Sequence, residues 1–175
     1  QQLVMDDINI WCAQNHIEKK TSVLFAYSLG KAQRVIKHLD TSQMKIYCHG
    51  AVYKMTEVLR QQINFPPTHL ITRETTKEEL AGHIVIAPPG AHGSAWMRKM
   101  VPYVTASASG WMTFRGARRR KAIDKGFVLS DHCDWDGLLE SIEATGCENV
   151  ITTHGYQEIF ARFLREEKGL NAISE

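Results

Sequence analysis

Short apolar runs alternate along the chain with segments whose apolar residues recur at helical spacing. Runs rich in Val, Ile, Leu and Phe predict buried strands, and they lie at 22–27, 45–48, 83–87, 103–107, 126–129 and 149–152. Helical spacing predicts helices, and these segments lie at 3–16, 31–39, 51–62, 94–100, 138–146 and 157–168. Strands that alternate with helices predict an α/β fold class with a mainly parallel sheet that helices cover on both faces.

Polar residues mark two further helix starts. Thr76, with Glu79 three residues later, has the spacing of a capping box, which predicts one short helical turn that ends at Gly82. Asp134 is a suitable N-cap for the helix that follows it, and Asp136 is suited to the first turn of that helix.

Two histidines follow the last two predicted strands. His132 comes a few residues after the run 126–129, and His154 comes directly after the run 149–152. We expect these runs and the helix between them to form a β-α-β unit with parallel strands and a right-handed crossover. Because working residues collect at the carboxyl ends of such strands, we expect His132 and His154 to lie side by side in a site.

Composition limits the class of protein. The 175 residues are enough for one good core or two small lobes, and the net charge of +2 neither demands nor excludes a nucleic-acid partner. No apolar run approaches the roughly 18 residues of a membrane span, and no signal peptide is present, so we expect no membrane partner. The four cysteines show no CxxC pairing, which favours reduced thiols and a cytoplasmic location. A chain that begins with Gln1 is expected to be a fragment or a processed chain.

Cationic residues offer two candidate anion sites. Lys31 follows Gly30 at a predicted helix start, and helix starts favour anions. The segment is not a Walker A motif, because Phe25 stands where that motif needs glycine and Ala32 where it needs Ser or Thr. A second site is a run with five cations in seven residues, namely Arg115, Arg118, Arg119, Arg120 and Lys121. This run is interpreted either as a solvated charged loop or as a contact to a phosphate backbone. Asp131 is interpreted either as a metal ligand or as a helix cap.

Several motifs in combination resemble one family. Ser-Asp-His-Cys-Asp-Trp at 130–135, followed by Thr-His-Gly at 153–155, is similar to the C-terminal signature of metallo-β-lactamase-fold nucleases with a β-CASP domain. The resemblance extends along nearly the whole chain through segments 25–34, 49–51, 87–90 and 109–112. The chain looks most like the bacterial ligase-associated DNA exonucleases, a group also described as mRNA 3′-end processing factors.

The resemblance implies a function and a set of roles. Residues 1–125 would be the β-CASP domain, and 126–175 the C-terminal βαβα return segment of the metallo-β-lactamase domain. His132 would protonate the leaving oxygen. His154 would complete the coordination of one of two zinc ions, and manganese is an alternative metal. Asp131 would lie beside the metal ligands. Lys31, Gly110 and the cationic run would contact DNA or RNA. Imidazole suits both histidine roles, as a zinc ligand and as a proton donor near neutral pH. Partners would include a DNA ligase and a helicase of the same pathway.

The chain also departs from this family. The hallmark His-x-His-x-Asp-His is absent, so the chain supplies one zinc ligand, and we expect this part alone to be inactive. A second hypothesis is therefore a non-catalytic module that binds nucleic acid or docks a subunit. A nucleotide-binding α/β enzyme rests on fold class alone, because the chain lacks GxGxxG as well as Walker A.

Overall fold

The computed structural model describes residues 2–114, 116 and 122–175, which form two compact units. The N-terminal unit is Gln1–Asp131 and the C-terminal unit is His132–Glu175. The assignment of these parts to a β-CASP domain and a metallo-β-lactamase domain stays a prediction.

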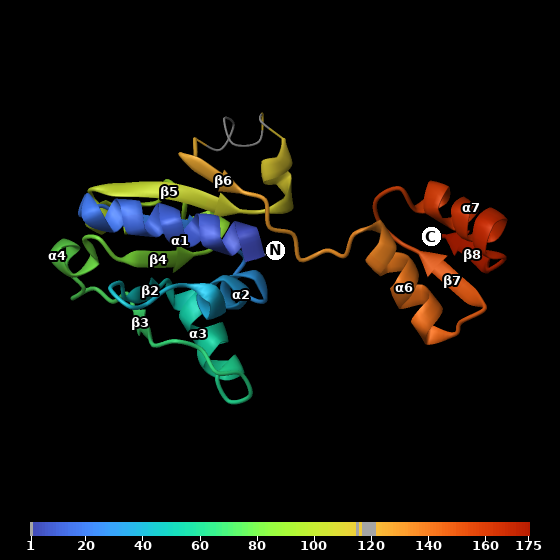
Figure 1. The fold of residues 1–175 in the computed structure, drawn as a ribbon, viewed down its shortest axis with the longest axis horizontal. Helices are drawn as coiled ribbons and strands as arrows, with labels where there is room; N and C mark the ends of the chain where they lie inside the picture. The colour runs from blue at the N-terminus through green and yellow to red at the C-terminus, as the bar shows by residue number, and fades with distance from the viewer. Residues whose placement is uncertain (1, 115, 117–121) are drawn as a thin grey trace. The chain divides into compact units, whose positions relative to one another are not determined.

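The N-terminal unit is built on a six-stranded sheet in the order β3-β2-β4-β1-β5-β6 (Figure 1). Every neighbouring pair of strands is parallel, which confirms the α/β class and the mainly parallel sheet. The strands are β1 (Thr21–Phe25), β2 (Ile46–Cys48), β3 (Thr68–Leu70), β4 (Ile84–Ala87), β5 (Tyr103–Ala108) and β6 (Lys125–Phe127).

Helices cover both faces of this sheet. The helical elements are α1 (Gln2–Ile17), α2 (Lys31–His38), α3 (Gly50–Leu59), α4 (Lys77–Leu80) and the 3-10 turns η1 (Pro89–Ala91), η2 (Ala95–Met100) and η3 (Gly110–Thr113). Successive side chains of a strand point to opposite faces. Leu24 therefore packs in the core that α1, α2 and α3 cover, whereas Val23 and Phe25 pack in the core beneath α4, η1 and η2. Both cores contain fully buried aliphatic side chains from the central strands.

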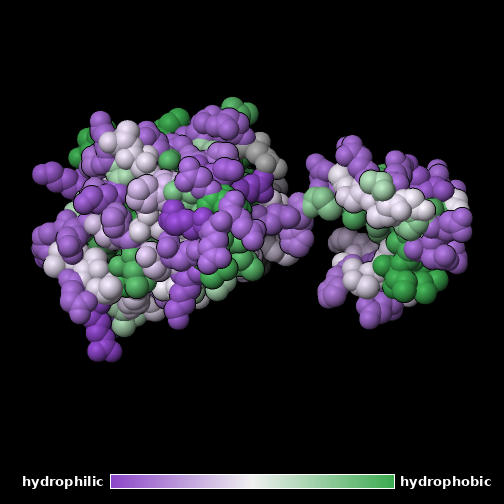
Figure 2. Space-filling view, turned by 90° about the horizontal axis from the view of Figure 1, so that it is seen from below, coloured by the Kyte–Doolittle hydropathy of each residue, from purple (hydrophilic) through white to green (hydrophobic). Residues whose placement is uncertain are grey.

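The C-terminal unit is smaller. It contains α6 (Trp135–Thr145), β7 (Asn149–Thr152), α7 (Gln157–Lys168) and β8 (Asn171–Ser174), and β7 pairs with β8 in parallel. Its core is small, with Ala161, Leu164 and Ala172 as its buried apolar residues. The paired residues Ile151 and Ile173 are 66% and 56% exposed, so one face of this two-stranded sheet presents apolar side chains to solvent. Figure 2 shows hydrophobic residues, in green, at the surface of this unit.

The capping predictions are confirmed at both helices. The Thr76 hydroxyl accepts from the Glu79 N–H at 3.2 Å, and the Glu79 carboxylate accepts from the Thr76 N–H at 2.8 Å. The Asp134 carboxylate accepts from the Gly137 N–H at 3.0 Å, and Asp136 lies in the first turn of α6. Within the described ranges, no helix has the length and apolar character needed to cross a bilayer.

The expected β-α-β unit at 126–152 is wrong. Strand β6 pairs with β5 in the large sheet, whereas β7 pairs with β8 in a separate sheet. The Asp124 carboxylate, directly before β6, accepts hydrogen bonds from the N–H and the hydroxyl of Thr105 on β5, at 2.8 and 2.7 Å. These bonds hold β6 beside β5. His132 and His154 therefore do not follow neighbouring strands of one sheet.

Candidate functional site

The carboxyl edge of the large sheet brings together residues from three strand ends. Because the six strands are parallel, the segments after β1, β5 and β6 all leave the sheet at this edge. The amino group of Lys31 lies 3.3 Å from Oδ2 of Asp131, and a guanidinium nitrogen of Arg34 lies 3.7 Å from its Oδ1. The same Arg34 group donates to the Ser130 carbonyl at 3.1 Å. Two cations of α2 thus hold the segment that leads to His132.

Lys31 is almost enclosed at this edge. Its side chain is 5% exposed, whereas that of Asp131 is 39% exposed. Its amino group also lies 5.3 Å from the ring centre of Tyr27, within the range of a cation–π contact. A buried ammonium group needs a counter-charge, and Asp131 supplies it. The family resemblance predicts that Lys31 contacts nucleic acid. That role stays a prediction, and the structure gives Lys31 an internal partner.

The turn between β1 and α2 is fixed by Gln33. Gly30 has a φ of +83°, a conformation that side chains other than glycine rarely adopt. The Gln33 side chain accepts from the Gly30 N–H at 2.8 Å and donates to the Ser28 carbonyl at 2.9 Å. It also donates to the Thr56 hydroxyl of α3 at 3.0 Å. The start of α2 is therefore held from both sides.

Gly110 lies at the same edge, after β5. A Cβ atom at this position would lie 3.4 Å from the Cβ of Ser130, so the backbone passes close to the segment that carries Asp131. The structure thus groups Gly110, Lys31 and Asp131, three of the residues selected from the sequence. The cationic run Arg115 and Arg118–Lys121 lies outside the described residues.

The two histidines belong to the C-terminal unit and are exposed. His132 directly follows Asp131 in the sequence, in the segment before α6. His154 follows β7 in the left-handed conformation, with a φ of +65°. Its N–H donates to the Gln157 side chain at 3.1 Å, and its Nδ1 lies 3.1 Å from the Thr153 hydroxyl. A non-glycine residue held in this conformation is uncommon and is often found at functional sites.

These residues do not form a complete metal site. Across the part of the chain that the structure describes, no group of three or more His, Cys, Asp or Glu side chains is arranged to hold a metal ion. Structural zinc sites use four ligands and catalytic ones three protein ligands. His154 would be one ligand, and the described residues do not complete a zinc site around it.

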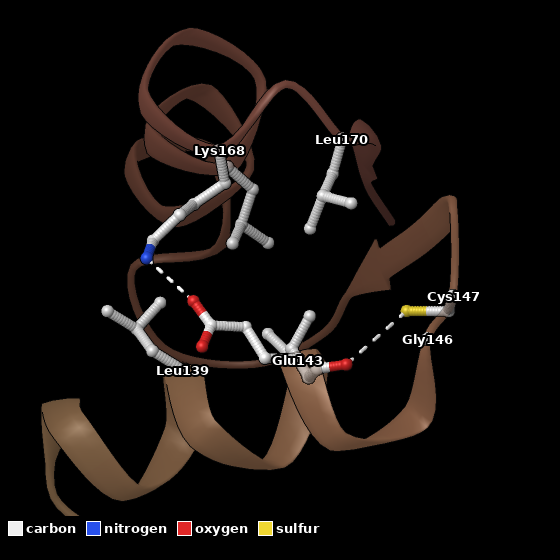
Figure 3. A pocket seen from close by; sticks show the side chains of 8 residues that line it. Leu139, Glu143, Gly146, Cys147, Lys168 and Leu170 are labelled. Carbon is white, nitrogen blue, oxygen red and sulfur yellow. Dashed lines mark hydrogen bonds and ion pairs between the residues drawn. The ribbon is translucent and has the colours of Figure 1, made fainter.

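A pocket of about 280 Å³ lies in the C-terminal unit (Figure 3). Apolar side chains of α6 and α7 line it together with Leu170 and Cys147. At its rim the Lys168 amino group lies 2.7 Å from the Glu143 carboxylate. The lining contains none of the residues selected from the sequence.

The buried thiols are not nucleophiles. Burial raises the pKa of Cys12 to about 12 and that of Cys48 to about 12, so both remain protonated at neutral pH.

The structure also reveals Arg34, Gln33 and Ser130 as parts of the carboxyl-edge arrangement. The position of Arg34, one helical turn after Lys31, was the available sequence signal for it.

Comparison with known proteins gives one informative similarity. No family model matches the chain. Over 170 residues, the chain is 39% identical to a protein named probable DNA ligase from Opitutus terrae (strain DSM 11246 / JCM 15787 / PB90-1). The alignment covers 97% of this chain and 16% of that protein, so the chain spans a minor part of its relative. The chain is thus similar to a segment of a larger protein whose name refers to DNA.

Proposed function

We propose that this chain is the C-terminal part of a metal-dependent phosphodiesterase, an exonuclease that acts on DNA or RNA, and that the chain alone is inactive. In this proposal His132 donates a proton to the leaving oxygen, and His154 is one ligand of a zinc or manganese ion. The remaining ligands come from outside the chain. The name of the relative supports DNA as the substrate. In this proposal a DNA ligase is a partner.

The observation that carries the proposal is the ion pair before His132. Asp131 is held by Lys31 and Arg34, so the residue directly before the proposed acid has a defined position at the carboxyl edge. Proton donors need such positioning, because general acids act only within hydrogen-bond reach of the group that they protonate. A solvated loop would not need a nearly buried lysine as a partner.

The exposed apolar face of the C-terminal unit supports the proposal in a second way. A two-stranded sheet is marginally stable on its own, and natural sheets cover their apolar faces. Ile151 and Ile173 would be covered by the metal-binding part of the longer protein.

The test compares the native longer protein with the 175-residue chain. We expect the longer protein to hydrolyse 5′- or 3′-labelled oligonucleotides in the presence of zinc or manganese, and the chain alone to release no product. We expect His154→Ala to lower both metal content and rate. His132→Ala should lower the rate and leave metal content unchanged, which separates the two roles.

Two results would contradict the proposal. One is a longer protein that shows no nuclease activity with either metal. The other is a His154→Ala variant that keeps its metal content and rate. Asp134→Asn is a control on the same segment, because the amide oxygen keeps the cap of α6.

A binding or docking module without catalysis is the second candidate. The cations Lys31 and Arg34 at the carboxyl edge support it. It predicts that the longer protein binds oligonucleotides and leaves them intact with zinc and with manganese.

A further inference from the structure

Two aromatic side chains are exposed next to the carboxyl-edge arrangement. Trp111 is 66% exposed and Phe114 is 59% exposed, although large aromatic side chains are usually well buried. Their ring centres lie 6.0 Å apart at an angle of 45°, so the two rings lie beside each other, and most of each side chain is open to solvent. We call Trp111 and Phe114 the aromatic pair.

The turn that carries the aromatic pair is rigidly held. The Trp111 N–H donates to the Ser109 hydroxyl at 3.3 Å, and the Phe114 N–H donates to the Trp111 carbonyl at 3.1 Å. The Ser109 N–H donates to the Phe127 carbonyl of β6 at 3.0 Å. These bonds fix the backbone on both sides of Trp111, so a ligand that contacts the rings costs little additional ordering.

Met112 explains why the two aromatic rings face outward. Its side chain packs against Gly126 of β6, where a Cβ atom would lie 2.8 Å from the sulfur. Gly126 thus leaves the space that Met112 occupies. The apolar residue in the middle of the turn faces the sheet, and the aromatic pair on either side of it remains outside.

The surroundings are cationic. Gly110, directly before Trp111, lies against Ser130, whose carbonyl accepts from Arg34. In this arrangement Lys31 and Arg34 outnumber the one carboxylate of Asp131. The sequence continues after Phe114 with the five cations of segment 115–121. An apolar patch with surplus positive charge favours a polyanion that carries exposed aromatic rings, such as a nucleic acid. It favours such a ligand over a protein surface with few acidic residues.

We propose that the aromatic pair is a stacking platform for unpaired bases of single-stranded DNA. The inference rests on the proposed function, because it names the form of the nucleic acid that the site receives. Proteins that bind single strands combine cationic grooves with aromatic side chains, on which bases stack with little dependence on sequence. In duplex DNA the base faces are covered by their neighbours, so a platform of this kind selects unpaired strands. The similarity to a protein named probable DNA ligase favours DNA over RNA.

The test measures binding of the 175-residue chain to a fluorescein-labelled dT12 strand, a matching 12-base-pair duplex and an rU12 strand by anisotropy. We expect dT12 to bind more tightly than both. Trp111→Ala and Phe114→Ala should each weaken dT12 binding roughly five- to hundredfold, the range measured when a stacking aromatic is removed. Trp111→Phe keeps a ring and should restore most of the affinity.

Two controls separate stacking from charge and from general surface effects. The slope of log affinity against log salt should not change in Trp111→Ala, because no cation is removed. Tyr156→Ala removes a side chain that is 85% exposed in the C-terminal unit, and we expect it to bind like the unaltered chain. Far-UV circular dichroism checks that each variant is folded.

The inference is overturned if dT12 does not bind, if it binds no more tightly than the duplex or rU12, or if Trp111→Ala changes its affinity less than twofold. It is also overturned if Tyr156→Ala causes the same loss. These results are independent of the nuclease test. A longer protein that cleaves while Trp111→Ala binds normally refutes the platform alone. A protein that binds through Trp111 without cleaving refutes the nuclease alone.

Discussion

Lys31 and Asp131 form an ion pair of 3.3 Å at the carboxyl edge of the sheet, between the start of α2 and the segment after β6. The pair joins parts of the chain that are distant in sequence, and the neighbouring bond from Arg34 to Ser130 spans 96 residues. Because the lysine is nearly buried, loss of the carboxylate would leave an ammonium group without its counter-charge.

We therefore expect Asp131→Asn to lower the free energy of unfolding by about 1–2 kcal/mol, between the values for exposed and buried pairs. Urea unfolding followed by circular dichroism measures this. Glu18→Gln is the matched control, because the Lys20–Glu18 pair is exposed on both sides, at 42% and 55%. We expect the control to change stability by less than about 0.5 kcal/mol. Equal losses in the two variants would show that burial of Lys31 is not the cause.

Gln33 provides a second test of the carboxyl edge. Its side chain makes three hydrogen bonds, to Gly30, Ser28 and Thr56, so Gln33→Ala removes a partner of the buried Thr56 hydroxyl and of two part-buried backbone groups. We expect a loss of about 2–3 kcal/mol in urea unfolding. Gln62→Ala, at an exposed position, should change stability by less than about 0.5 kcal/mol. A Gln33→Ala loss no larger than that of Gln62→Ala would contradict the assigned role.

The local pattern predicted most elements of the fold. Strand β7 and helix α7 have the predicted bounds. The strand lies on a distinct apolar run, and the helix has a clear amphipathic stripe, so both have a strong local signal. Strands β3 and β8 were missed. Each has only three or four residues, and at least one of them is polar, so the segment is too short to show a hydrophobic period. Sequence signals for capping were reliable, since they depend on neighbours within one helical turn.

Strand pairing was the part that the sequence did not yield. The run that became β6 pairs with β5, and the bonds between Asp124 and Thr105 that hold it there join two different segments. A similar limit applies to the site. The local sequence suggested Lys31 and Asp131 separately, but their contact depends on the order of strands in the sheet. The roles of His132 and His154 stay predictions.

Acid should destabilise the N-terminal unit through His83. Burial lowers the pKa of His83, and the nearby His16, Lys45 and His69 lower it further. The unfolded chain, with a histidine pKa of about 6.5, therefore binds this proton more readily than the folded chain. The stability that His83 contributes is present above about pH 6.5 and is lost as the pH falls through the folded pKa.

We expect His83→Asn to reduce the fall in Tm between pH 8 and pH 5. The asparagine oxygen can still accept from the Lys45 N–H, which donates to Nδ1 of His83 at 3.2 Å, so the substitution removes titration and keeps the hydrogen bond. Differential scanning calorimetry across this range measures the effect. His38→Asn, at an exposed position at the end of α2, is the control. An unchanged pH slope in His83→Asn would exclude His83 as the cause.

Ile151 and Ile173 form an exposed pair on β7 and β8. In the 175-residue chain, replacing both with threonine removes little burial, so we expect a change in Tm close to that of Ile17→Thr, an 81% exposed control on α1. In the longer protein that the proposed function requires, the same double substitution should lower stability by about 2–4 kcal/mol, because each buried isoleucine contributes roughly 1.5–3 kcal/mol and threonine retains part of it. Hydrogen exchange of β7 and β8 should be slower in the longer protein than in the chain. Equal effects of the substitutions in both proteins would show that this face is not covered, and would remove one support for the proposed function.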